Sequence, residues 1–255
     1  MSTTSHDQLF AKPLADIAGF RFDAAVAEVF PDMIRRSVPG YETIIAMTGA
    51  LAGRYVQPHT RCYDLGCSLG ASSIVMRDNI KVSGVRIIAI DSAEAMVARC
   101  REVLAVAPGS FARAGGEIAE AVPVDLICGD IRTLAIERTS MAVLNFTLQF
   151  IPVDDRAALL RNIYRGLEPG GVLILSEKIA FADAHLDALM VDLHHSFKRA
   201  NGYSELEVSQ KRSALEAVLV PETLDRHRAR LADVGFRSVE VWFQCFNFAS
   251  LLAIK

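Results

Sequence analysis

Four short segments carry residues that could bind a nucleoside, and each follows a run of apolar residues. The first is the loop 64–70, DLGCSLG, in which glycine permits a tight turn and a close approach of the backbone to a ligand. Asp91 ends the run RIIAID, where a carboxylate can accept hydrogen bonds from two ribose hydroxyls. Asp130-Ile131 and Asn145 end two further runs. Because ligands of open α/β sheets bind beyond the carboxyl ends of the strands, these segments predict one binding crevice.

Each segment also has a purely structural interpretation. The glycine loop could be an ordinary tight turn between a strand and a helix. Ser92 could cap the helix that follows it, with Asp91 beside the positive end of that helix. Asp130 could be a solvated loop residue, and Asn145 could be a buried amide whose hydrogen bonds are satisfied by the protein.

Arg212 interrupts an apolar stripe on a predicted helix. Apolar side chains stand one turn before it and one and two turns after it, at Val208, Leu215 and Leu219. A guanidinium that faces inward needs a partner, and a planar carboxylate is its best match. Arg212 is therefore a candidate for binding a ligand carboxylate. Its alternatives are an intrachain ion pair and a side chain that extends to solvent.

Two tyrosines and two histidines have weaker signals. Tyr41 and Tyr203 are expected in exposed loops, where they could contact a ligand or simply pack. His194 and His195 are adjacent, so they point to different faces of a helix, and no acid or cysteine stands at a convincing ligand spacing. No metal site is expected.

Hydrophobic periodicity predicts the elements that must position these residues. Strands are expected at 61–66, 86–91, 124–130, 141–147 and 171–179, with helices at 71–80, 93–105, 154–167 and 221–236 between or after them. The tail 236–255 predicts two strands with a bend near Asn247. Two helices separated at Pro31, and a third over about 42–55, precede the first strand. Ser204 and Glu207 have the spacing of a capping box.

Together these elements predict an α/β fold with a doubly wound, mainly parallel sheet of seven strands, covered on both faces. We expect a single domain with three parts. Residues 1–57 form an N-terminal helical cap, residues 58–181 and 221–255 form the Rossmann-like core, and residues 182–220 form a helical insertion.

Composition excludes several classes of protein. Of the 255 residues, 51% are hydrophobic and 22% charged, which excludes wholesale disorder. The net charge of −3 argues against direct binding of nucleic acid. No apolar run is long enough to span a membrane, and the N-terminus lacks the pattern of a secretory signal. Five widely spaced cysteines without a CxxC pair favour a reducing cytoplasm.

The predicted layout, a parallel core finished by a strand pair, is that of S-adenosylmethionine-dependent methyltransferases. DLGCSLG resembles their ligand loop, which more often has glycine where Ser68 stands. In that layout, an acid at Asp130 meets the adenine amino group and the next backbone N–H meets a ring nitrogen. Asn145 would then face the amino-acid end of the ligand.

Several longer segments resemble a more specific family, the carboxy-S-adenosyl-L-methionine synthases. They are FDAAVAEVFPDMIRRSVPGY, YDLGCSLGAS, VLNFTLQF, FKRANGYSELEVSQKR and WFQCFNF, and the resemblance runs from about Phe22 to Lys255. It implies an enzyme that converts S-adenosylmethionine and prephenate into carboxy-S-adenosylmethionine and phenylpyruvate. It also implies a homodimer whose product serves a tRNA carboxymethyltransferase acting on the wobble uridine.

Carried over by matching position, the resemblance implies a set of ligand contacts and a role for Arg212, which would hold the new carboxylate. The contacts are Tyr41, Gly66, Cys67, Ser68, Asp91, Ser92, Asp130, Ile131, Asn145 and Arg212. The departures are mild: Ser92 stands where many members have asparagine, and the loop 107–122 is longer than usual. Two alternative functions remain, an ordinary methyltransferase in which Arg212 is structural and a non-catalytic adenosylmethionine-binding accessory protein.

Overall fold

A computed structural model describes the chain except residues 1–4, 14–18, 107–110, 113–117, 120 and 217. In this part of the chain, seven strands follow one another in one sheet, in the order β5-β2-β1-β6-β7-β10-β9. Their bounds are β1 Arg61–Leu65, β2 Arg86–Asp91, β5 Val124–Cys128, β6 Thr139–Asn145, β7 Leu167–Ala180, β9 Ser238–Cys245 and β10 Phe248–Ile254. The predicted seven-stranded α/β sheet is confirmed.

Strand direction also follows the prediction. β1 pairs in parallel with β2 and β6, β2 with β5, and β6 with β7. β10 is antiparallel to both β7 and β9, so the tail forms the expected strand pair, with its turn at Phe246 and Asn247. Two short additions are β8 (Glu222–Thr223), which pairs with β7, and the pair β3 (Phe111–Ala112) and β4 (Ile118–Ala119). The rest of the long loop expected over 107–122 lies largely outside the described residues.

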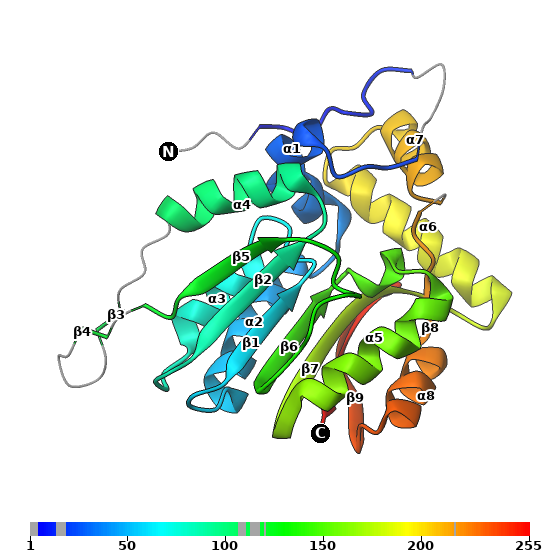
Figure 1. Cartoon of the computed structure of the whole chain (residues 1–255). Helices are drawn as coiled ribbons and strands as arrows, with labels where there is room; N and C mark the ends of the chain where they lie inside the picture. Colours follow the sequence, from blue (N-terminus) through cyan, green and yellow to red (C-terminus); the bar gives the residue numbers. More distant parts are fainter. Residues whose placement is uncertain (1–4, 14–18, 107–110, 113–117, 120, 217) are drawn as a thin grey trace.

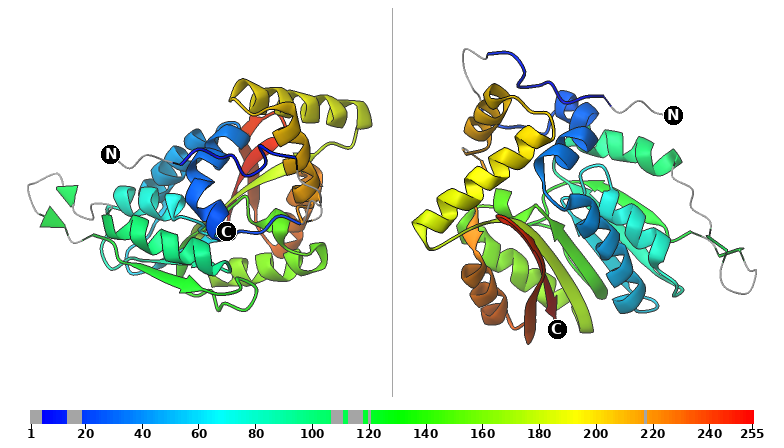
Figure 2. Two further views of the ribbon diagram at one scale, coloured as in Figure 1. Left: turned by 90° about the horizontal axis from the view of Figure 1, so that it is seen from above. Right: turned by 180° about the vertical axis from the view of Figure 1, so that it is seen from behind.

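Helices cover both faces of the sheet (Figures 1 and 2). On one face, α5 (Val153–Gly166) and α8 (Leu224–Val234) bury Leu160 and Leu231 against Tyr63 and Leu144 of the strands. On the other, α2 (Tyr41–Tyr55) and α3 (Ala71–Asn79) pack against strand residues that point the opposite way. α4 (Glu94–Val106) lies beside β5 and β2. Burial on both faces explains why the strands are almost continuously apolar.

α1 (Ala24–Ser37) corrects one prediction, because it runs through Pro31 without a break. A proline inside a helix removes one hydrogen bond and usually ends or kinks the helix. Here Val26 and Phe30 before the proline and Met33 after it are buried in one cluster with Met96 of α4. We infer that packing on both sides of Pro31 offsets the lost hydrogen bond.

The helical insertion lies beyond the carboxyl ends of the strands, beside α1 (Figure 1). It consists of α6 (Ala184–Ala200) and α7 (Glu205–Glu216). The capping box that starts α7 is confirmed, since the Ser204 N–H donates to Glu207 Oε2 over 2.7 Å and the Glu207 N–H donates to Ser204 Oγ over 3.3 Å. A second boundary differs from expectation: α5 ends at Gly166, and Leu167 already pairs with Thr139 as the first residue of β7.

Arg156 of α5 ties three segments together below the insertion. Its side chain is fully buried and pairs with Glu222 of β8 over 2.5 Å. Its other nitrogens donate to the carbonyl oxygens of Gln149, Ile151 and Val220. Arg230 of α8 also pairs with Glu222, so the carboxylate is shared by two guanidinium groups.

Replacing Arg156 by methionine is expected to lower the free energy of unfolding by about 3 kcal/mol, because breaking a buried ion pair leaves polar groups without partners. Chemical denaturation would measure the loss. Arg161→Met, on the exposed side of the same helix, is the matched control and should change stability by less than about 0.5 kcal/mol. Equal stability of the two variants would contradict a structural role for the buried network.

Candidate functional site

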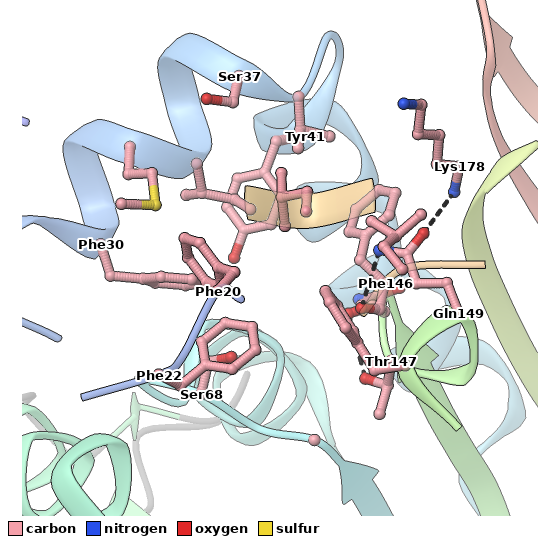
Figure 3. Close-up of a pocket in the computed structure, with 18 of the residues that line it drawn as sticks. Phe20, Phe22, Phe30, Ser37, Tyr41, Ser68, Phe146, Thr147, Gln149 and Lys178 are labelled. Atoms are coloured by element: carbon pink, nitrogen blue, oxygen red, sulfur yellow. Dashed lines mark hydrogen bonds between the residues drawn. The ribbon is translucent and has the colours of Figure 1, made fainter. Parts of the chain in front are cut away.

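A cavity of about 640 Å³ opens beyond the carboxyl ends of β1, β2 and β6, between the sheet and the helices α1, α6 and α7. Its lining differs in chemistry: the glycine loop and two carboxylates lie at the strand ends, aromatic rings come from several segments, and basic side chains come from α6, α7 and β7. Figure 3 shows several of the aromatic rings and Lys178. The ten ligand contacts that the resemblance implies all line it: Tyr41, Gly66, Cys67, Ser68, Asp91, Ser92, Asp130, Ile131, Asn145 and Arg212. Which of them contact a ligand stays a prediction.

The glycine loop is held by backbone hydrogen bonds to the neighbouring strand. The N–H groups of Gly66 and Cys67 both donate to the Ile90 carbonyl, over 2.8 and 2.9 Å. Gly66 has φ +82°, and a Cβ atom there would lie 2.4 Å from the side chain of Thr147. Ser68 also has a positive φ, +49°, which explains why related loops more often carry glycine at that place.

Asp64, the first residue of the loop motif, holds the start of α3 and does not line the cavity. Its buried carboxylate accepts hydrogen bonds from the N–H and the hydroxyl of Ser73, over 2.9 and 2.7 Å. Burial raises the pKa of Asp64 to about 6, and the two bonds from Ser73 act in the opposite direction. Asp64 is therefore a positioning residue.

Asp91 has the structural role that the sequence offered as one alternative, and it also lies at the cavity. Its carboxylate accepts from the N–H of Ser68 and from the N–H of Ala93, each over 2.9 Å, so it joins the glycine loop to the start of α4. Burial raises the pKa of Asp91. A carboxylate has about four acceptor sites, so these two bonds leave capacity for ligand hydroxyls.

Asp130, a solvated loop residue in the structural interpretation, has a side chain that is 38% exposed and is also ion-paired. Arg132 pairs with it over 2.6 Å and with Asp155 over 2.7 Å. The hydrogen bond from Arg132 holds the pKa of Asp130 below its usual value. Ile131, next in the chain, is buried at the cavity wall. The pair fixes the Asp130 carboxylate in one orientation at the end of β5.

Asn145 has protein partners for both ends of its amide. Its Nδ2 donates to Ser72 Oγ over 2.9 Å, and its Oδ1 accepts from Ser176 Oγ over 2.6 Å. The structural interpretation of a satisfied amide is thus correct, and the residue nevertheless lines the cavity. These two bonds fix the orientation of the Asn145 amide, with its nitrogen toward Ser72 and its oxygen toward Ser176.

Aromatic rings form the wall that sequence reasoning missed (Figure 3). Phe22 contacts Phe20 and Phe150 edge to face, with ring centroids 5.1 and 5.4 Å apart. Tyr41, expected in an exposed loop, is instead the first residue of α2 and lies near Phe146. Burial raises the pKa of Tyr41. These rings come from distant parts of the chain, so no local pattern relates them.

A buried glutamate positions the part of this wall that follows β6. Glu177 of β7 accepts from the N–H groups of Leu148 and Gln149, over 3.0 and 2.8 Å, at the start of the short helix η1 (Leu148–Phe150). Gln149 in turn donates to the Phe146 carbonyl and accepts from the Lys178 N–H. Burial raises the pKa of Glu177 to about 8. Strand β7 thereby fixes the backbone that carries Phe146 and Phe150.

The basic wall corrects the predicted orientation of Arg212. Arg212 lines the cavity, but its side chain is exposed, and the buried side of α7 carries Val208, Lys211 and Ala214. The apolar spacing predicted the wrong face because the neighbours of α7 supply polar partners, including Asp7 for Lys211. Lys178 and Lys198 also line the cavity, and sequence reasoning did not find them.

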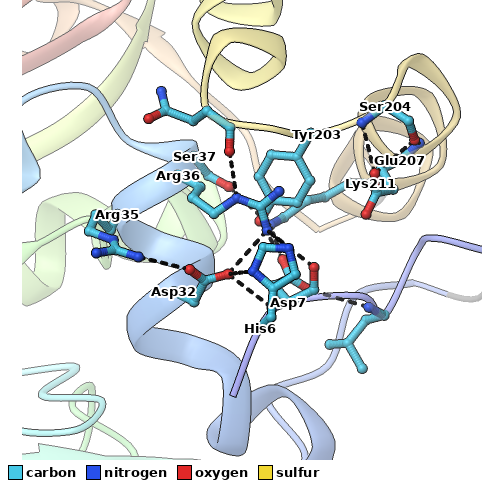
Figure 4. A network of polar contacts seen from close by, with 12 residues as sticks. His6, Asp7, Asp32, Arg35, Arg36, Ser37, Tyr203, Ser204, Glu207 and Lys211 are labelled. Carbon is cyan, nitrogen blue, oxygen red and sulfur yellow. Dashed lines mark hydrogen bonds and ion pairs between the residues drawn. The ribbon is translucent and has the colours of Figure 1, made fainter. Parts of the chain in front are cut away.

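Tyr203 corrects a second prediction, because it is 5% exposed instead of lying in an open loop. Its hydroxyl donates to Asp7, and the Arg36 guanidinium lies 3.9 Å from the centre of its ring (Figure 4). Lys211 donates to the Tyr203 and Ser37 hydroxyls over 3.2 and 3.0 Å. The N-terminal segment around Asp7 is thereby joined to α1 and α7.

The described residues contain neither a metal-binding cluster nor a membrane-spanning helix. They hold no cluster of three histidine, cysteine or acidic residues suited to a metal ion. None of their helices is both long and apolar enough to cross a bilayer. From the sequence, His194 is a poor candidate for a metal ligand. In the structure its Nε2 lies 2.8 Å from the Ser37 carbonyl oxygen.

Known proteins resemble this chain at two levels. Residues 63–171 match the family described as "Methyltransferase domain". The carboxy-S-adenosyl-L-methionine synthase of Trichlorobacter lovleyi is 55% identical over 253 residues, which are 99% of this chain and 100% of that protein. The synthase of Vibrio cholerae is 56% identical, over 98% of this chain and 97% of that protein.

Solved structures support the fold alone. Human N-acetylserotonin methyltransferase, in complex with SAM, superposes with a TM-score of 0.58 at 16% identity, covering 91% of this chain and 55% of that one. Magnesium protoporphyrin IX methyltransferase from Synechocystis, with bound SAH, gives a TM-score of 0.56 at 16% identity, covering 88% and 87%. The predicted Rossmann-like methyltransferase fold is confirmed by these likenesses.

Gly66→Ala is expected to lower the free energy of unfolding by about 1–3 kcal/mol, because the new Cβ would collide with Thr147 and the left-handed backbone would be strained. Ser68→Gly, two residues on, is the control. It relieves a positive φ, so it should leave stability within about 1 kcal/mol of the parent. Thermal or chemical denaturation compares the two. A Gly66→Ala variant as stable as the parent would show that the loop has room to move.

Proposed function

The chain belongs to the carboxy-S-adenosyl-L-methionine synthase family, and we propose that it converts S-adenosylmethionine and prephenate into carboxy-S-adenosylmethionine and phenylpyruvate. One observation carries the proposal on the structural side. The cavity that collects the strand-end residues also collects basic side chains, Arg212 among them. Methyl transfer gains nothing from a cation near an already positive sulfonium. A reaction whose product bears a new carboxylate on that methyl carbon does gain from a nearby cation, because the cation stabilises the carboxylate.

In this proposal the sheet side of the cavity holds S-adenosylmethionine. Asp91 accepts the ribose hydroxyls with the acceptor sites that its two backbone bonds leave over. Asp130 accepts from the adenine amino group, and the Ile131 N–H meets a ring nitrogen. The loop around Cys67, with Asn145, faces the amino-acid end. The aromatic wall supplies the apolar surface that an adenine ring and a sulfonium require.

The proposed reaction has three steps. Prephenate loses carbon dioxide from its ring carboxylate and hydroxide from its ring carbon, and the ring becomes aromatic as phenylpyruvate forms. The hydroxide removes a proton from the sulfonium methyl, giving water and an ylide. The ylide carbon then bonds to carbon dioxide, and Arg212 stabilises the carboxylate that forms. Atoms and charge balance, with water as the third product.

The reaction needs a site that keeps carbon dioxide close and water out. The rings of Phe20, Phe22 and Phe150 supply such a wall, since Phe22 contacts each of the other two and all three line the cavity. In this proposal no side chain is required as a base, because the leaving hydroxide serves. The site therefore works by holding two substrates together.

We also propose the wider setting that the family implies. The enzyme would act as a cytoplasmic homodimer, and its product would serve a tRNA carboxymethyltransferase that modifies the wobble uridine. The net charge of −3 supports a role in which this chain makes the donor and does not bind tRNA itself.

The direct test incubates the purified protein with S-adenosylmethionine and prephenate and measures the masses of the nucleoside products. We expect a species heavier than S-adenosylmethionine by one carbon dioxide, formed together with phenylpyruvate. Prephenate labelled in the ring carboxylate should pass its label to that species. Unmodified S-adenosylmethionine, with S-adenosylhomocysteine released only when a methyl acceptor is added, would instead identify an ordinary methyltransferase. Binding with no turnover of any kind would indicate an accessory protein.

Arg212→Leu is expected to lower the rate of carboxylated product about a hundredfold, because the developing carboxylate loses its cation. The affinity for S-adenosylmethionine, measured by calorimetry, should stay near that of the parent. Arg199→Leu removes a positive charge from an exposed place on α6 and is the control, with activity expected to be unchanged. Parent-like product formation by Arg212→Leu would remove Arg212 from the mechanism.

A further inference from the structure

Lys198 is a buried cation that ends in the cavity. It is 4% exposed, and it lines the cavity from the last turn of α6. Within the described residues, no hydrogen bond or ion pair of its ammonium group is found. A buried ammonium without a partner is costly and rare in folded proteins. We expect such an ammonium group where a bound anionic ligand supplies the missing partner.

Lys211 shows what a satisfied lysine looks like in the same region. It is equally buried, at 3% exposed, yet it pairs with Asp7 over 3.2 Å and donates to the hydroxyls of Ser37 and Tyr203. Asp7 itself also accepts from the Tyr203 hydroxyl. The carboxylate that could have neutralised Lys198 is therefore already engaged (Figure 4).

The groups around Lys198 make this end of the cavity positive. The positive charges of Lys178 in β7 and Lys211 in α7 lower the pKa of Lys198. The negative charge of Asp7 raises it. His195 is near Lys198, Lys178 and Arg212 at once, since all of them depress its pKa in addition to burial. The acids of the cavity, Asp91 and Asp130, stand at the strand ends with partners of their own. This end of the cavity is thus suited to an anion.

Two of these cations come from different helices. Arg212 belongs to α7 and Lys198 to α6, so they can meet different parts of one ligand. A planar guanidinium suits a carboxylate held in two-point contact, and an ammonium acts as a compact charge for a second one. A substrate with two carboxylates therefore matches this wall better than one with a single carboxylate.

We propose that Lys198 is a specificity-determining residue that binds the carboxylate the substrate keeps, the one adjacent to its oxo group, while Arg212 holds the carboxylate that is transferred. This inference rests on the proposed function, because it assigns the two carboxylates of prephenate to two cations. It makes the enzyme select a dicarboxylate, and it makes the 2-oxo acid product a ligand of Lys198 alone.

The test replaces Lys198 by methionine, which has similar length and suits a buried place. We expect the KM for prephenate to rise about tenfold or more, as for the loss of one hydrogen bond to a charged group, while the affinity for S-adenosylmethionine stays the same. Thermal stability should be equal or higher, since a buried unpaired charge is removed; a residue with a structural ion pair would lose stability. Lys198→Gln is the second variant, should the first fold poorly.

Phenylpyruvate has one carboxylate, so its binding shows which of the two cations, Lys198 or Arg212, holds that carboxylate. Its affinity for the protein loaded with S-adenosylmethionine is measured by calorimetry, without turnover. Lys198→Met should weaken it about tenfold, whereas Arg212→Leu and the exposed control Arg199→Met should not. If Arg212→Leu weakened the binding of phenylpyruvate and Lys198→Met did not, the roles of Arg212 and Lys198 would be exchanged and the assignment overturned.

The pH dependence gives a further readout. Burial, with the charges of Lys211 and Lys178, lowers the pKa of Lys198 to about 7. Only the ammonium form attracts a carboxylate, so phenylpyruvate should bind best below pH 7 and more weakly as the pH rises above it. In Lys198→Met this part of the pH dependence should disappear. An identical profile in parent and variant would contradict the inference.

The two proposals fail in different ways. If the parent makes no carboxylated product, the proposed function fails, and the binding of phenylpyruvate still reports on Lys198. If the parent makes the product but Lys198→Met keeps the parental KM for prephenate and affinity for phenylpyruvate, the function stands and the role of Lys198 is wrong.

Discussion

The parallel pairing of β1 with β2 and β6 is the constraint on which the site depends. Parallel strands end at the same edge of a sheet, so the residues after each strand share one space although they are far apart in the chain. The bond from the Ser68 N–H to Asp91 makes this concrete, because the loop after β1 is held by the residue that ends β2. Asn145, at the end of β6, is fixed in the same way by Ser72 and Ser176.

The other side of the cavity is supplied by elements that do not belong to the sheet. α1, α6 and α7 lie across the strand ends, and α6 and α7 bring the basic side chains Lys198, Lys211 and Arg212 to the cavity. Buried polar groups hold these helices in place: Asp7, Tyr203 and Lys211 form one network, and the guanidinium of Arg36 joins it from α1 through Asp7 and Asp32. The carboxylates of the cavity lie at the strand ends, where Arg132 pairs with Asp130, and a group of cations lies toward α6 and α7.

This arrangement of charges agrees with the chemistry proposed. A sulfonium ligand is positive and is best held by the carboxylate end and by aromatic faces, whereas an anionic partner is drawn to the lysines and Arg212. The proposed reaction through free carbon dioxide requires its protein above all to hold the two ligands together in one cavity, where their opposite charges attract. Stability and function are linked here, since Glu177 and Arg156 hold the backbone of the aromatic wall through buried bonds.

The sequence by itself determined the fold class and the strand ends, because hydrophobic periodicity, glycine and caps are local signals. The full set of ten predicted ligand contacts came from the family resemblance, and all ten line the cavity. Tertiary structure decided the rest. Pro31 stays within a helix because packing on both sides outweighs its local effect, and Tyr203 is buried because Asp7 meets it from the other end of the chain. Arg212 lies on an exposed face and Lys198 on a buried one because the partners of α6 and α7, and not their own periodicity, determine which side chains turn inward. Such long-range contacts leave no trace in any local pattern.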